Sequence, residues 1–316
     1  MIDVYDVVVI GAGPVGLYAG FFAAENKLRV AIVDALPDVG GQLTALYPQK
    51  FIFDVAGYPQ VTATQLVDKL KRQALKHHVS LLLEFKVVTL SLCEDESYRI
   101  VSEQGREIRG RYIIIAVGAG LITPRKLELP EAERYLDRGL EYVVKDVEEY
   151  GHRRVLIVGG GDTALDWANS LISVAREVTV IHRSERFVGF EGSLQKLRQS
   201  SCAVHTDTRL TAISGEGKVE RVQITNSKEG WTKELEIERI LGCIGFTPKL
   251  GFIKEIGFEI AEGSIRAAEN MRTNVTNVYA VGDISNHPGR IKLISTGFGN
   301  VQIAVNDIIR RSNNPS

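Results

Sequence analysis

The feature that most constrains this chain is a glycine-rich hexapeptide between an apolar run and a helical pattern, and it occurs twice. Gly11–Gly16 follows the apolar run Val7–Ile10, and Gly159–Ala164 follows the apolar run Val155–Val158. A second apolar run comes after each helical pattern, so each region has the order strand, helix, strand. The repeat predicts an α/β fold with two Rossmann-like dinucleotide-binding domains and accompanying antiparallel β segments.

The first hexapeptide has the GxGxxG form, in which each glycine has a physical role. Gly11 permits the tight turn after the strand, Gly13 lets a pyrophosphate approach the backbone, and Gly16 allows close packing of the helix. Pro14 opens that helix, whose first amides then face the phosphates. Asp34 ends the next strand, 23 residues after Gly11, where a carboxylate can bind ribose hydroxyls. These residues predict a first dinucleotide site.

The second hexapeptide has the GxGxxA form of the same motif and opens the helical stretch 163–175. We expect a second dinucleotide to bind here. The candidate residues are Gly159, Gly161, Asp162 and Thr163.

The segment after the next strand, residues 182–186, lacks the carboxylate that would bind a ribose. Its Arg183 and Arg186 could instead contact a 2′-phosphate, because a guanidinium pairs well with phosphate oxygens. This pattern favours NADPH, with NADH still possible. The alternative is a solvated, charged turn.

Near the end of the chain, the apolar run Val278–Val281 leads into Gly282-Asp283. Asp283 could bind the ribityl chain of a flavin dinucleotide, because such a molecule is longer than one strand-helix-strand unit can contact. The alternative is an ordinary strand-to-turn ending.

Two glycine clusters indicate where the chain passes between domains. The strand-like run Tyr112–Val117 ends at Gly118, and the run Ile240–Ile244 ends at Gly245. We therefore predict a discontinuous first domain, residues 1–117 and 246–316, with a second domain, residues 118–245, inserted between its parts. The alternating segments Tyr98–Val101 and Val219–Thr225 suit small antiparallel sheets beside the parallel ones.

The composition excludes several function classes. A formal charge of −1 over 316 residues gives no reason to expect nucleic acid or an anionic membrane as a partner. The apolar stretch 112–122 is shorter than the roughly 20 residues that a membrane span needs, so we expect no membrane span and a cytoplasmic location. Cys93, Cys202 and Cys243 are far apart, and no spacing typical of metal ligands occurs, so we expect ordinary thiols and no metal.

Several stretches in register resemble the thioredoxin reductase-like flavoproteins, and within them the ferredoxin-NADP reductases of that type. The stretches beyond the two hexapeptides are Gly40-Gly41-Gln42-Leu43, Leu46-Tyr47-Pro48, Asp54–Pro59, Pro124–Leu127, Gly282-Asp283, Lys292–Ile294 and Gly297–Gly299. The resemblance covers nearly the whole chain. It implies a homodimer in which the first domain binds FAD and the second binds NADPH, and in which electrons pass to a small carrier such as ferredoxin or flavodoxin.

The resemblance also implies which residues contact the flavin. Tyr47 would stack against the isoalloxazine ring and position it, although a plain core aromatic is the alternative. No side chain is expected to act as an acid or a base, because the cofactors carry the chemistry. The candidate FAD residues are Gly11, Gly13, Pro14, Gly16, Asp34, Gly41, Gln42, Leu43, Tyr47, Gly118, Asp283 and Thr296.

The chain departs from the resembling families at three places. Thioredoxin reductases carry a Cys-x-x-Cys pair just before the second hexapeptide, whereas residues 142–146 here contain no cysteine, so dithiol exchange is not expected. Ser184 and Val188 stand where NADPH-preferring members have arginines, so the preference for NADPH should be modest. The chain ends at Ser316, where relatives commonly extend over the partner's flavin; either a further segment belongs here or that side of the flavin is more open.

An acidic carrier would need a basic surface on this protein. On the helical stretch 65–77, Lys69, Arg72 and Lys76 share one face, for which a solvated helix face is the alternative. Two other functions stay open on the sequence alone. One is an NAD(P)H oxidase or a reductase of another acceptor, and the other is a non-enzymatic flavin redox sensor.

Overall fold

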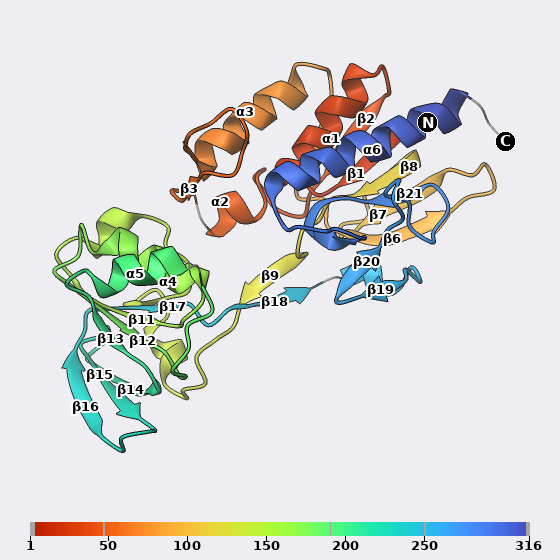
Figure 1. Ribbon diagram of the computed structural model, residues 1–316. Helices are drawn as coiled ribbons and strands as arrows, with labels where there is room; N and C mark the ends of the chain where they lie inside the picture. Colours follow the sequence, from red (N-terminus) through yellow and green to blue (C-terminus); the bar gives the residue numbers. More distant parts are fainter. Residues whose placement is uncertain (1–3, 47, 190, 250, 314–316) are drawn as a thin grey trace. The chain divides into compact units, whose positions relative to one another are not determined.

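The computed structural model of the protein describes residues 4–46, 48–189, 191–249 and 251–313. The chain forms two compact units, residues 1–122 with 248–316 and residues 123–247 (Figure 1). Both unit boundaries fall inside short strands, β9 (Leu121–Pro124) and β18 (Phe246–Lys249), which pair with each other. The boundaries anticipated from the glycine clusters, 117/118 and 245/246, lie just before these strands, because the glycines mark turns and the chain continues as a strand.

The first unit contains a mixed sheet with helices packed on it (Figure 1). Its helices are α1 (Pro14–Glu25), α2 (Gln42–Leu46), α3 (Ala63–Leu75) and α6 (Ile294–Asn313), with the 3-10 turns η3 (Gly251–Lys254) and η4 (Gly282–Ile284). Its strands are β1 (Val4–Ile10), β2 (Val30–Val33), β3 (Phe51–Ile52), β4 (Val61–Thr62), β5 (Ser80–Leu82), β6 (Val87–Leu92), β7 (Tyr98–Ser102), β8 (Glu107–Ile115), β19 (Ile260–Ala261), β20 (Ser264–Arg266), β21 (Val278–Ala280) and β22 (Ser285–Asn286).

The main sheet of this unit has the order β5-β2-β1-β8-β7-β6, and β21 also pairs with β8. Strands β5, β2, β1, β8 and β21 run parallel, as the strand-helix-strand pattern requires. Because β8 is long, its first half pairs antiparallel with β7 while its last three residues pair with β21. The segment Tyr98–Val101 therefore extends the main sheet and does not form the separate small sheet that we expected.

The last four residues of β1, Val7–Ile10, are buried whichever face of the sheet they point to, which explains why this run is apolar without interruption. Val7 and Val9 pack in the cluster that contains buried residues of α1, α3 and α6, whereas Val8 and Ile10 pack in a cluster on the opposite face. The alternation follows from the two-residue period of a strand. It fixes the end of β1, and with it the first glycine-rich loop, between two packed layers.

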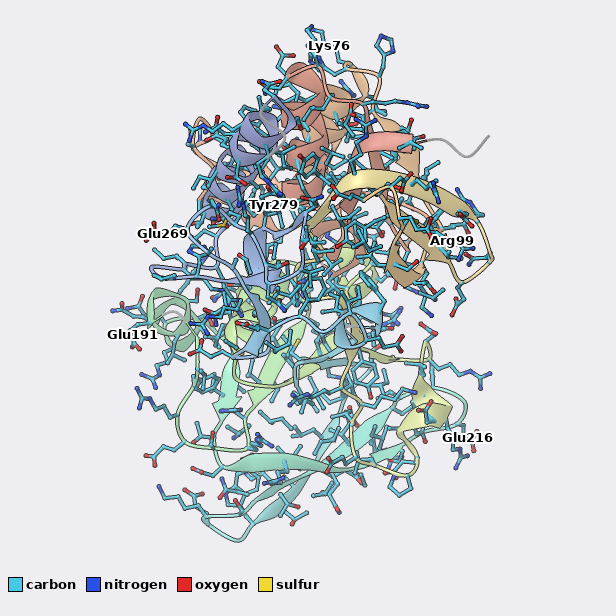
Figure 2. The ribbon with its side chains drawn as sticks, turned by 90° about the vertical axis from the view of Figure 1, so that its right-hand side faces the viewer. Lys76, Arg99, Glu191, Glu216, Glu269 and Tyr279 are labelled. Carbon is cyan, nitrogen blue, oxygen red and sulfur yellow. The ribbon has the colours of Figure 1, made fainter. Side chains whose placement is uncertain are left out.

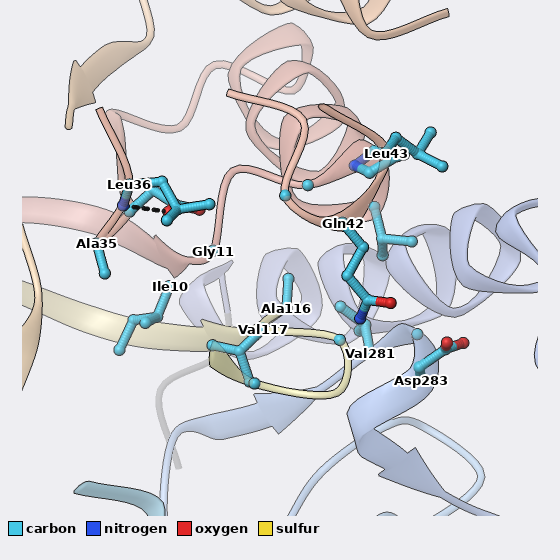
Figure 3. Close-up of a pocket in the computed structure, with 18 of the residues that line it drawn as sticks. Ile10, Gly11, Ala35, Leu36, Gln42, Leu43, Ala116, Val117, Val281 and Asp283 are labelled. Carbon is cyan, nitrogen blue, oxygen red and sulfur yellow. Dashed lines mark hydrogen bonds between the residues drawn. The ribbon is translucent and has the colours of Figure 1, made fainter. Parts of the chain in front are cut away.

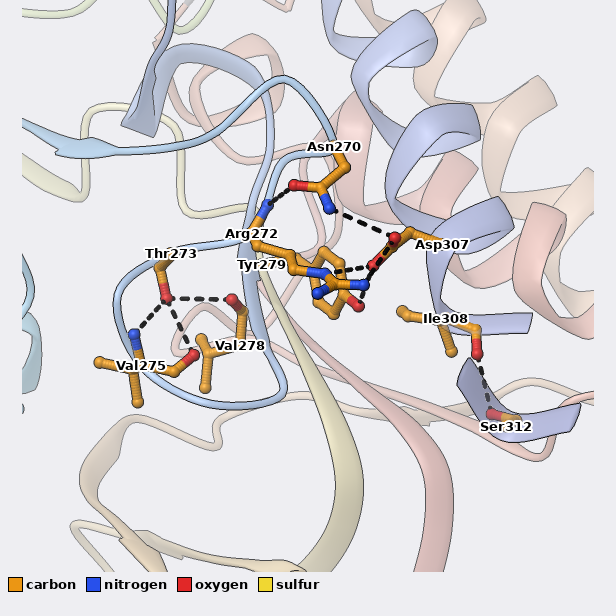
Figure 4. Close-up of polar contacts among 9 residues, drawn as sticks. All are labelled: Asn270, Arg272, Thr273, Val275, Val278, Tyr279, Asp307, Ile308 and Ser312. Atoms are coloured by element: carbon orange, nitrogen blue, oxygen red, sulfur yellow. Dashed lines mark hydrogen bonds and ion pairs between the residues drawn. The ribbon is translucent and has the colours of Figure 1, made fainter. Parts of the chain in front are cut away.

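A polar cluster ties α6 to β21 (Figure 4). The buried Tyr279 of β21 donates its hydroxyl hydrogen to Asp307 Oδ2 at 2.6 Å, and Arg272 donates to both oxygens of Asp307 at 2.6 and 2.8 Å. Burial raises the pKa of Tyr279 to about 12. Burial also acts to raise the pKa of Asp307, but the hydrogen bonds from Arg272 and Tyr279 outweigh it and lower that pKa. In Figure 2, Tyr279 lies inside this unit, whereas Lys76 and Arg99 extend outward.

The second unit contains a parallel sheet of order β10-β17-β11-β12-β13 and an antiparallel sheet of order β14-β15-β16. Its helices are α4 (Asp162–Leu171) and α5 (Glu191–Arg198), with the 3-10 turns η1 (Ala132–Tyr135) and η2 (Val147–Tyr150). Its strands are β10 (Leu140–Glu141), β11 (Arg154–Val158), β12 (Glu177–Ile181), β13 (Ala203–His205), β14 (Thr208–Ser214), β15 (Arg221–Asn226), β16 (Thr232–Glu236) and β17 (Arg239–Gly242).

The predicted α/β class with two Rossmann-like units is confirmed, and the segment Val219–Thr225 falls in the expected antiparallel sheet, mainly as β15. The helix expected over 163–175 ends early, at Leu171. The residues after it continue as a turn, in which the Leu171 carbonyl oxygen accepts the amides of both Val174 and Ala175.

Candidate functional site

The first glycine-rich loop connects β1 to α1 with no room for side chains at two of its glycines. Gly11 has φ +111°, and a Cβ there would lie 2.5 Å from the Ala116 carbonyl oxygen. A Cβ at Gly16 would lie 1.8 Å from the Gly11 carbonyl oxygen. At Gly13, by contrast, no atom lies within 4 Å of an added Cβ. The loop is therefore tight on the protein side and open at Gly13, where a ligand could approach the backbone.

Asp34 lies directly beside this loop at the end of β2. Its Oδ2 accepts the Ala12 amide at 2.5 Å, and its Oδ1 accepts the Leu36 amide at 2.9 Å. Burial nevertheless raises the pKa of Asp34, and the hydrogen bonds from Ala12 and Leu36 offset only part of that shift. The two amides fix the carboxylate, and its remaining lone pairs could accept hydroxyl hydrogens from a ribose.

A cavity of about 360 Å³ in the first unit brings the predicted residues together. Figure 3 shows Ala35 and Leu36 at one side of it and Gln42 and Asp283 at the other, with Gly11 between them. An elongated ligand could therefore extend from the end of β2 to the end of β21. The predicted residues that line the cavity are Gly11, Gly13, Pro14, Asp34, Gly41, Gln42, Leu43, Gly118 and Asp283.

Three other predicted FAD residues have different positions. Gly16 lies in α1 behind the loop, and Thr296 lies in the first turn of α6; neither is among the residues that line this cavity. Tyr47 lies outside the residues that the structure describes.

Asp283 is held by its backbone at the end of β21. Its carbonyl oxygen accepts a hydrogen bond from Arg290 Nη2 at 2.6 Å, and the preceding Gly282 amide donates to Asn300 Oδ1 at 3.3 Å. The long helix α6 begins at Ile294, which lines the same cavity. The positive end of a helix dipole therefore lies at the cavity wall, where it favours negative charge in a ligand.

The second glycine-rich loop connects β11 to α4 and is equally crowded at its start. Gly159 has φ +151°, and a Cβ there would lie 2.2 Å from the Cys243 carbonyl oxygen. A Cβ at Gly160 would lie 2.4 Å from the ring of His182. Gly161 is open, with no atom within 4 Å of an added Cβ. Asp162 and Thr163 form the first turn of α4, as expected for residues beside a phosphate.

The segment after β12 presents its two arginines to solvent. Arg183 and Arg186 are exposed, and neither has an ion-pair partner within the part of the chain that the structure describes. His182 Nε2 lies 2.9 Å from Ser184 Oγ and 3.2 Å from the Arg186 carbonyl oxygen. Burial lowers the pKa of His182, and the charge of Arg183 lowers it further. The two guanidinium groups are available to an anionic ligand.

Comparison with known proteins agrees with this arrangement. The profile of the pyridine nucleotide-disulphide oxidoreductase family matches residues 5–307. The chain belongs to this family. It is 42% identical over 310 residues to the ferredoxin–NADP reductase 2 of Chloroherpeton thalassium, covering 96% of this chain and 90% of the relative. It is 40% identical over 306 residues to the ferredoxin–NADP reductase of Halalkalibacterium halodurans, covering 96% and 92%.

Solved structures agree as well. The thioredoxin reductase of Lactococcus lactis matches with a TM-score of 0.83 and 27% identity, covering 97% of this chain and 98% of that one. The thioredoxin reductase of T. acidophilum matches with a TM-score of 0.85 at 24% identity, covering 98% and 99%, which shows the shared fold. The resemblance to thioredoxin reductase-like ferredoxin-NADP reductases inferred from the sequence motifs is confirmed, and the protein is an oxidoreductase.

In this member of the pyridine nucleotide-disulphide oxidoreductase family, the thiols of Cys202 and Cys243 are unsuited to dithiol chemistry. Burial raises the pKa of Cys202 to about 11 and that of Cys243 to about 12, so both stay protonated at neutral pH. Tyr142, in the segment where thioredoxin reductases carry their cysteine pair, accepts the Leu127 amide at 2.9 Å with its hydroxyl oxygen. Among the described residues there is also no group of three potential metal ligands.

Sequence reasoning missed several residues that line the cavity. Asp54 and Lys292 lie in loops that line it, and Lys86 directly precedes β6. Asp54 and Lys292 lie within stretches that carried the family resemblance, which was the only available signal. None of the three belongs to a motif with a known spacing, so no role could be predicted for them.

The basic face expected on α3 exists, but two of its three cations contact neighbouring side chains. Lys69, Arg72 and Lys76 are exposed. The Lys69 ammonium lies 4.7 Å from the centre of the Tyr58 ring, and Arg72 pairs with Asp68 at 2.8 Å. These contacts leave Lys76 as the least engaged of the three cations.

No helix within the described ranges is long and apolar enough to span a membrane.

Proposed function

We propose that this protein is an FAD-dependent oxidoreductase that passes electrons from NADPH to a small one-electron carrier such as ferredoxin or flavodoxin. The observation that carries the proposal is the elongated cavity of the first unit. It joins an open glycine-rich loop to two strand-end carboxylates, Asp34 and Asp283, and the chain has a second such loop in its other unit. The names of the relatives, ferredoxin–NADP reductase, support the same activity.

FAD would bind to the first unit, which we assign as the FAD domain, residues 1–117 and 246–316. Gly11, Gly13 and Pro14 would receive the pyrophosphate at the amides of α1, and Asp34 would bind the adenosine ribose. Gly16 keeps the helix close enough for those amides to reach. The open space at Gly13 and the fixed carboxylate of Asp34 fit such a ligand.

The flavin end of FAD would lie toward α2 and the end of β21. Asp283 would bind the ribityl chain, and Tyr47 would position the isoalloxazine ring by stacking. The remaining residues proposed for this end are Gly41, Gln42, Leu43, Gly118 and Thr296.

NADPH would bind to the second unit, which we assign as the NAD(P)H domain, residues 118–245. The phosphates would meet the amides at the start of α4, and Arg183 and Arg186 would pair with the 2′-phosphate. Because only these two arginines are present, we expect NADH to be used as well, but less efficiently. The residues proposed for the phosphates are Gly159, Gly161, Asp162 and Thr163.

The bound flavin supplies the ability to take two electrons from NADPH and to release them singly to a carrier. The protein's own residues bind and orient the two cofactors and need no acid or base. The carrier would be acidic and would meet basic side chains such as Lys76. We further propose that the protein works as a cytoplasmic homodimer, by analogy with the family that its motifs resemble.

The decisive experiment is spectroscopic and kinetic. We expect purified protein to carry one FAD per chain, to lose its flavin absorbance when NADPH is added without oxygen, and to reduce cytochrome c much faster with ferredoxin present. Protein that binds no FAD even after incubation with the cofactor contradicts the proposal. Bleaching without any ferredoxin dependence would instead indicate an oxidase or a reductase of another acceptor.

A further inference from the structure

We infer that Lys292 stabilises the reduced form of the bound flavin and so sets its reduction potential. The inference rests on the proposed function, because it assumes that the cavity of the first unit holds FAD with its ring system toward the end of β21. It assigns a role to a charged residue that none of the sequence motifs explained.

The loop that carries Lys292 is tied to the Asp283 end of the cavity at several points. Before Lys292, Arg290 Nη2 donates to the Asp283 carbonyl oxygen at 2.6 Å. After it, Ser295 Oγ donates to the Asp54 carbonyl oxygen at 2.6 Å, and a Cβ at Gly297 would lie 3.5 Å from the Gly282 Cα. Lys292 itself lines the cavity. It therefore belongs to the end of the cavity opposite Asp34.

The ammonium group of Lys292 is not neutralised by a neighbour. Among the described residues, no carboxylate lies within ion-pairing distance of it. The positive end of α6 begins two residues later, at Ile294, and adds to the same positive potential. Asp54 lines the same cavity, and a carboxylate there acts against this potential.

Positive charge at this end of the cavity favours the reduced state. A flavin ring gains electron density when it is reduced, so a cation beside it stabilises reduced FAD more than oxidised FAD. Proteins commonly tune the electronics of a cofactor with such charges. Lys292 would therefore raise the potential of the bound FAD.

Lys86 provides a matched control because it is also a lysine that lines the cavity. It lies at the other end, since the amide of its neighbour Phe85 donates to the Asp34 carbonyl oxygen at 2.7 Å. Its ammonium group is already paired with Glu103 at 2.6 Å. Removing this charge should leave the flavin ring almost unaffected.

The test compares Lys292→Met, Lys292→Arg and Lys86→Met in the FAD-loaded protein, by equilibration with a redox dye of known potential. We expect Lys292→Met to lower the ratio of reduced to oxidised FAD at a fixed dye ratio by about threefold, or about 15 mV for a two-electron couple. Lys292→Arg and Lys86→Met should stay close to wild type. The effect of Lys292→Met should shrink at high ionic strength, because the side chain is exposed.

Affinities separate this role from a purely structural one. Lys292→Met should weaken the binding of reduced FAD about threefold while leaving the affinity for oxidised FAD nearly unchanged, as the cycle of binding and reduction requires. Equal losses for both forms with an unchanged potential would overturn the inference, and so would a change confined to the Michaelis constant for ferredoxin. Failure of wild-type protein to hold FAD would contradict the proposed function instead.

Discussion

The two glycine-rich loops share one backbone plan although they lie in different units. Gly11 and Gly159 both have positive φ, +111° and +151°, and in both a Cβ would overlap a carbonyl oxygen of a neighbouring segment, that of Ala116 at 2.5 Å or of Cys243 at 2.2 Å. In both loops the third residue, Gly13 or Gly161, is open. The shared features are those that a pyrophosphate on a helix N-terminus requires, and they do not distinguish one dinucleotide from another.

The loops differ in the side chain that lies against the second residue of the loop. Asp34 comes 22 residues after Ala12, and His182 comes 22 residues after Gly160. In the first unit the Asp34 carboxylate accepts the Ala12 amide, whereas in the second unit the His182 ring occupies the space that a side chain at residue 160 would need. A carboxylate accepts hydrogen bonds from ribose hydroxyls but repels a 2′-phosphate. A histidine followed by exposed arginines does not repel a 2′-phosphate. We therefore expect cofactor choice to depend on this one position and the residues after it.

The largest expected effect concerns a second difference, the helix residue that is Gly16 in one loop and Ala164 in the other. Gly16→Ala would place a Cβ 1.8 Å from the Gly11 carbonyl oxygen, so the helix and loop must move apart. We expect a loss of about 3 kcal/mol in the free energy of unfolding, measured by urea denaturation, and loss of bound FAD. Ala164→Gly, the matched change, should cost about 1 kcal/mol.

Equal effects of Gly16→Ala and Ala164→Gly on stability would mean that the two loops do not differ in how closely their helices approach. Retention of one FAD per chain in Gly16→Ala would contradict the close packing directly.

The next largest effect is expected for the carboxylate. Asp34→Asn keeps the shape of the side chain but removes charge-assisted hydrogen bonds to the ribose, so we expect FAD to bind roughly 10- to 100-fold more weakly. NADPH binding to the second unit should be unchanged, which makes the same variant its own control. Fluorescence titration of FAD-free protein with FAD and with NADPH measures both, and unchanged FAD affinity would remove Asp34 from the site.

The same substitution has a consequence for pH. Because burial raises the pKa of Asp34, the folded FAD-free protein holds a proton that the unfolded chain has lost, between the ordinary carboxyl pKa and the raised one. The free energy of unfolding should therefore fall as the pH rises through this interval. Asp34→Asn should abolish that part of the fall, which urea denaturation of FAD-free protein at several pH values would reveal.

The sequence predicted the backbone of both sites better than their side-chain environment. Glycines such as Gly11 and Gly159 report positive φ and close approach, and Asp34 has a fixed spacing, so their positions were predictable. Asp54, Lys86 and Lys292 come from loops far apart in sequence, and only the folded chain brings them to one cavity.

Errors in the predicted elements have a related cause. The helix α4 passes into a turn after Leu171, and the joining of β7 to the main sheet depends on the length of β8. Neither feature has a periodic signature in the sequence, because both depend on which hydrogen-bond partner is available after folding.

A smaller effect is expected for the exposed arginines. Arg183→Ala and Arg186→Ala should each raise the Michaelis constant for NADPH several-fold, because a charge-assisted contact at an exposed site contributes about 1 kcal/mol. The Michaelis constant for NADH should change little, because NADH has no 2′-phosphate. Steady-state kinetics with both cofactors tests this, and an equal loss for both would move the 2′-phosphate away from these residues.

The smallest expected effect is a lower Michaelis constant for NADPH. It tests whether one more arginine after the second loop strengthens the preference for NADPH. Ser184 is exposed and contacts the His182 ring at 2.9 Å, so a longer side chain there can extend into solvent beside Arg183. Ser184→Arg adds a cation where NADPH-preferring members of the resembling group have one. We expect the Michaelis constant for NADPH to fall about threefold, since an exposed charge contributes less than about 1 kcal/mol.

The salt dependence and a neutral control make that small effect interpretable. The gain from Ser184→Arg should disappear at high ionic strength, because screening weakens an exposed pair, whereas Ser184→Gln should show no gain at any salt concentration. NADH kinetics should be the same in wild type and both variants, since the added charge has no phosphate to meet. If Ser184→Arg improves NADH and NADPH equally, the residues after His182 do not contact the 2′-phosphate, and the contrast with Asp34 does not explain cofactor choice.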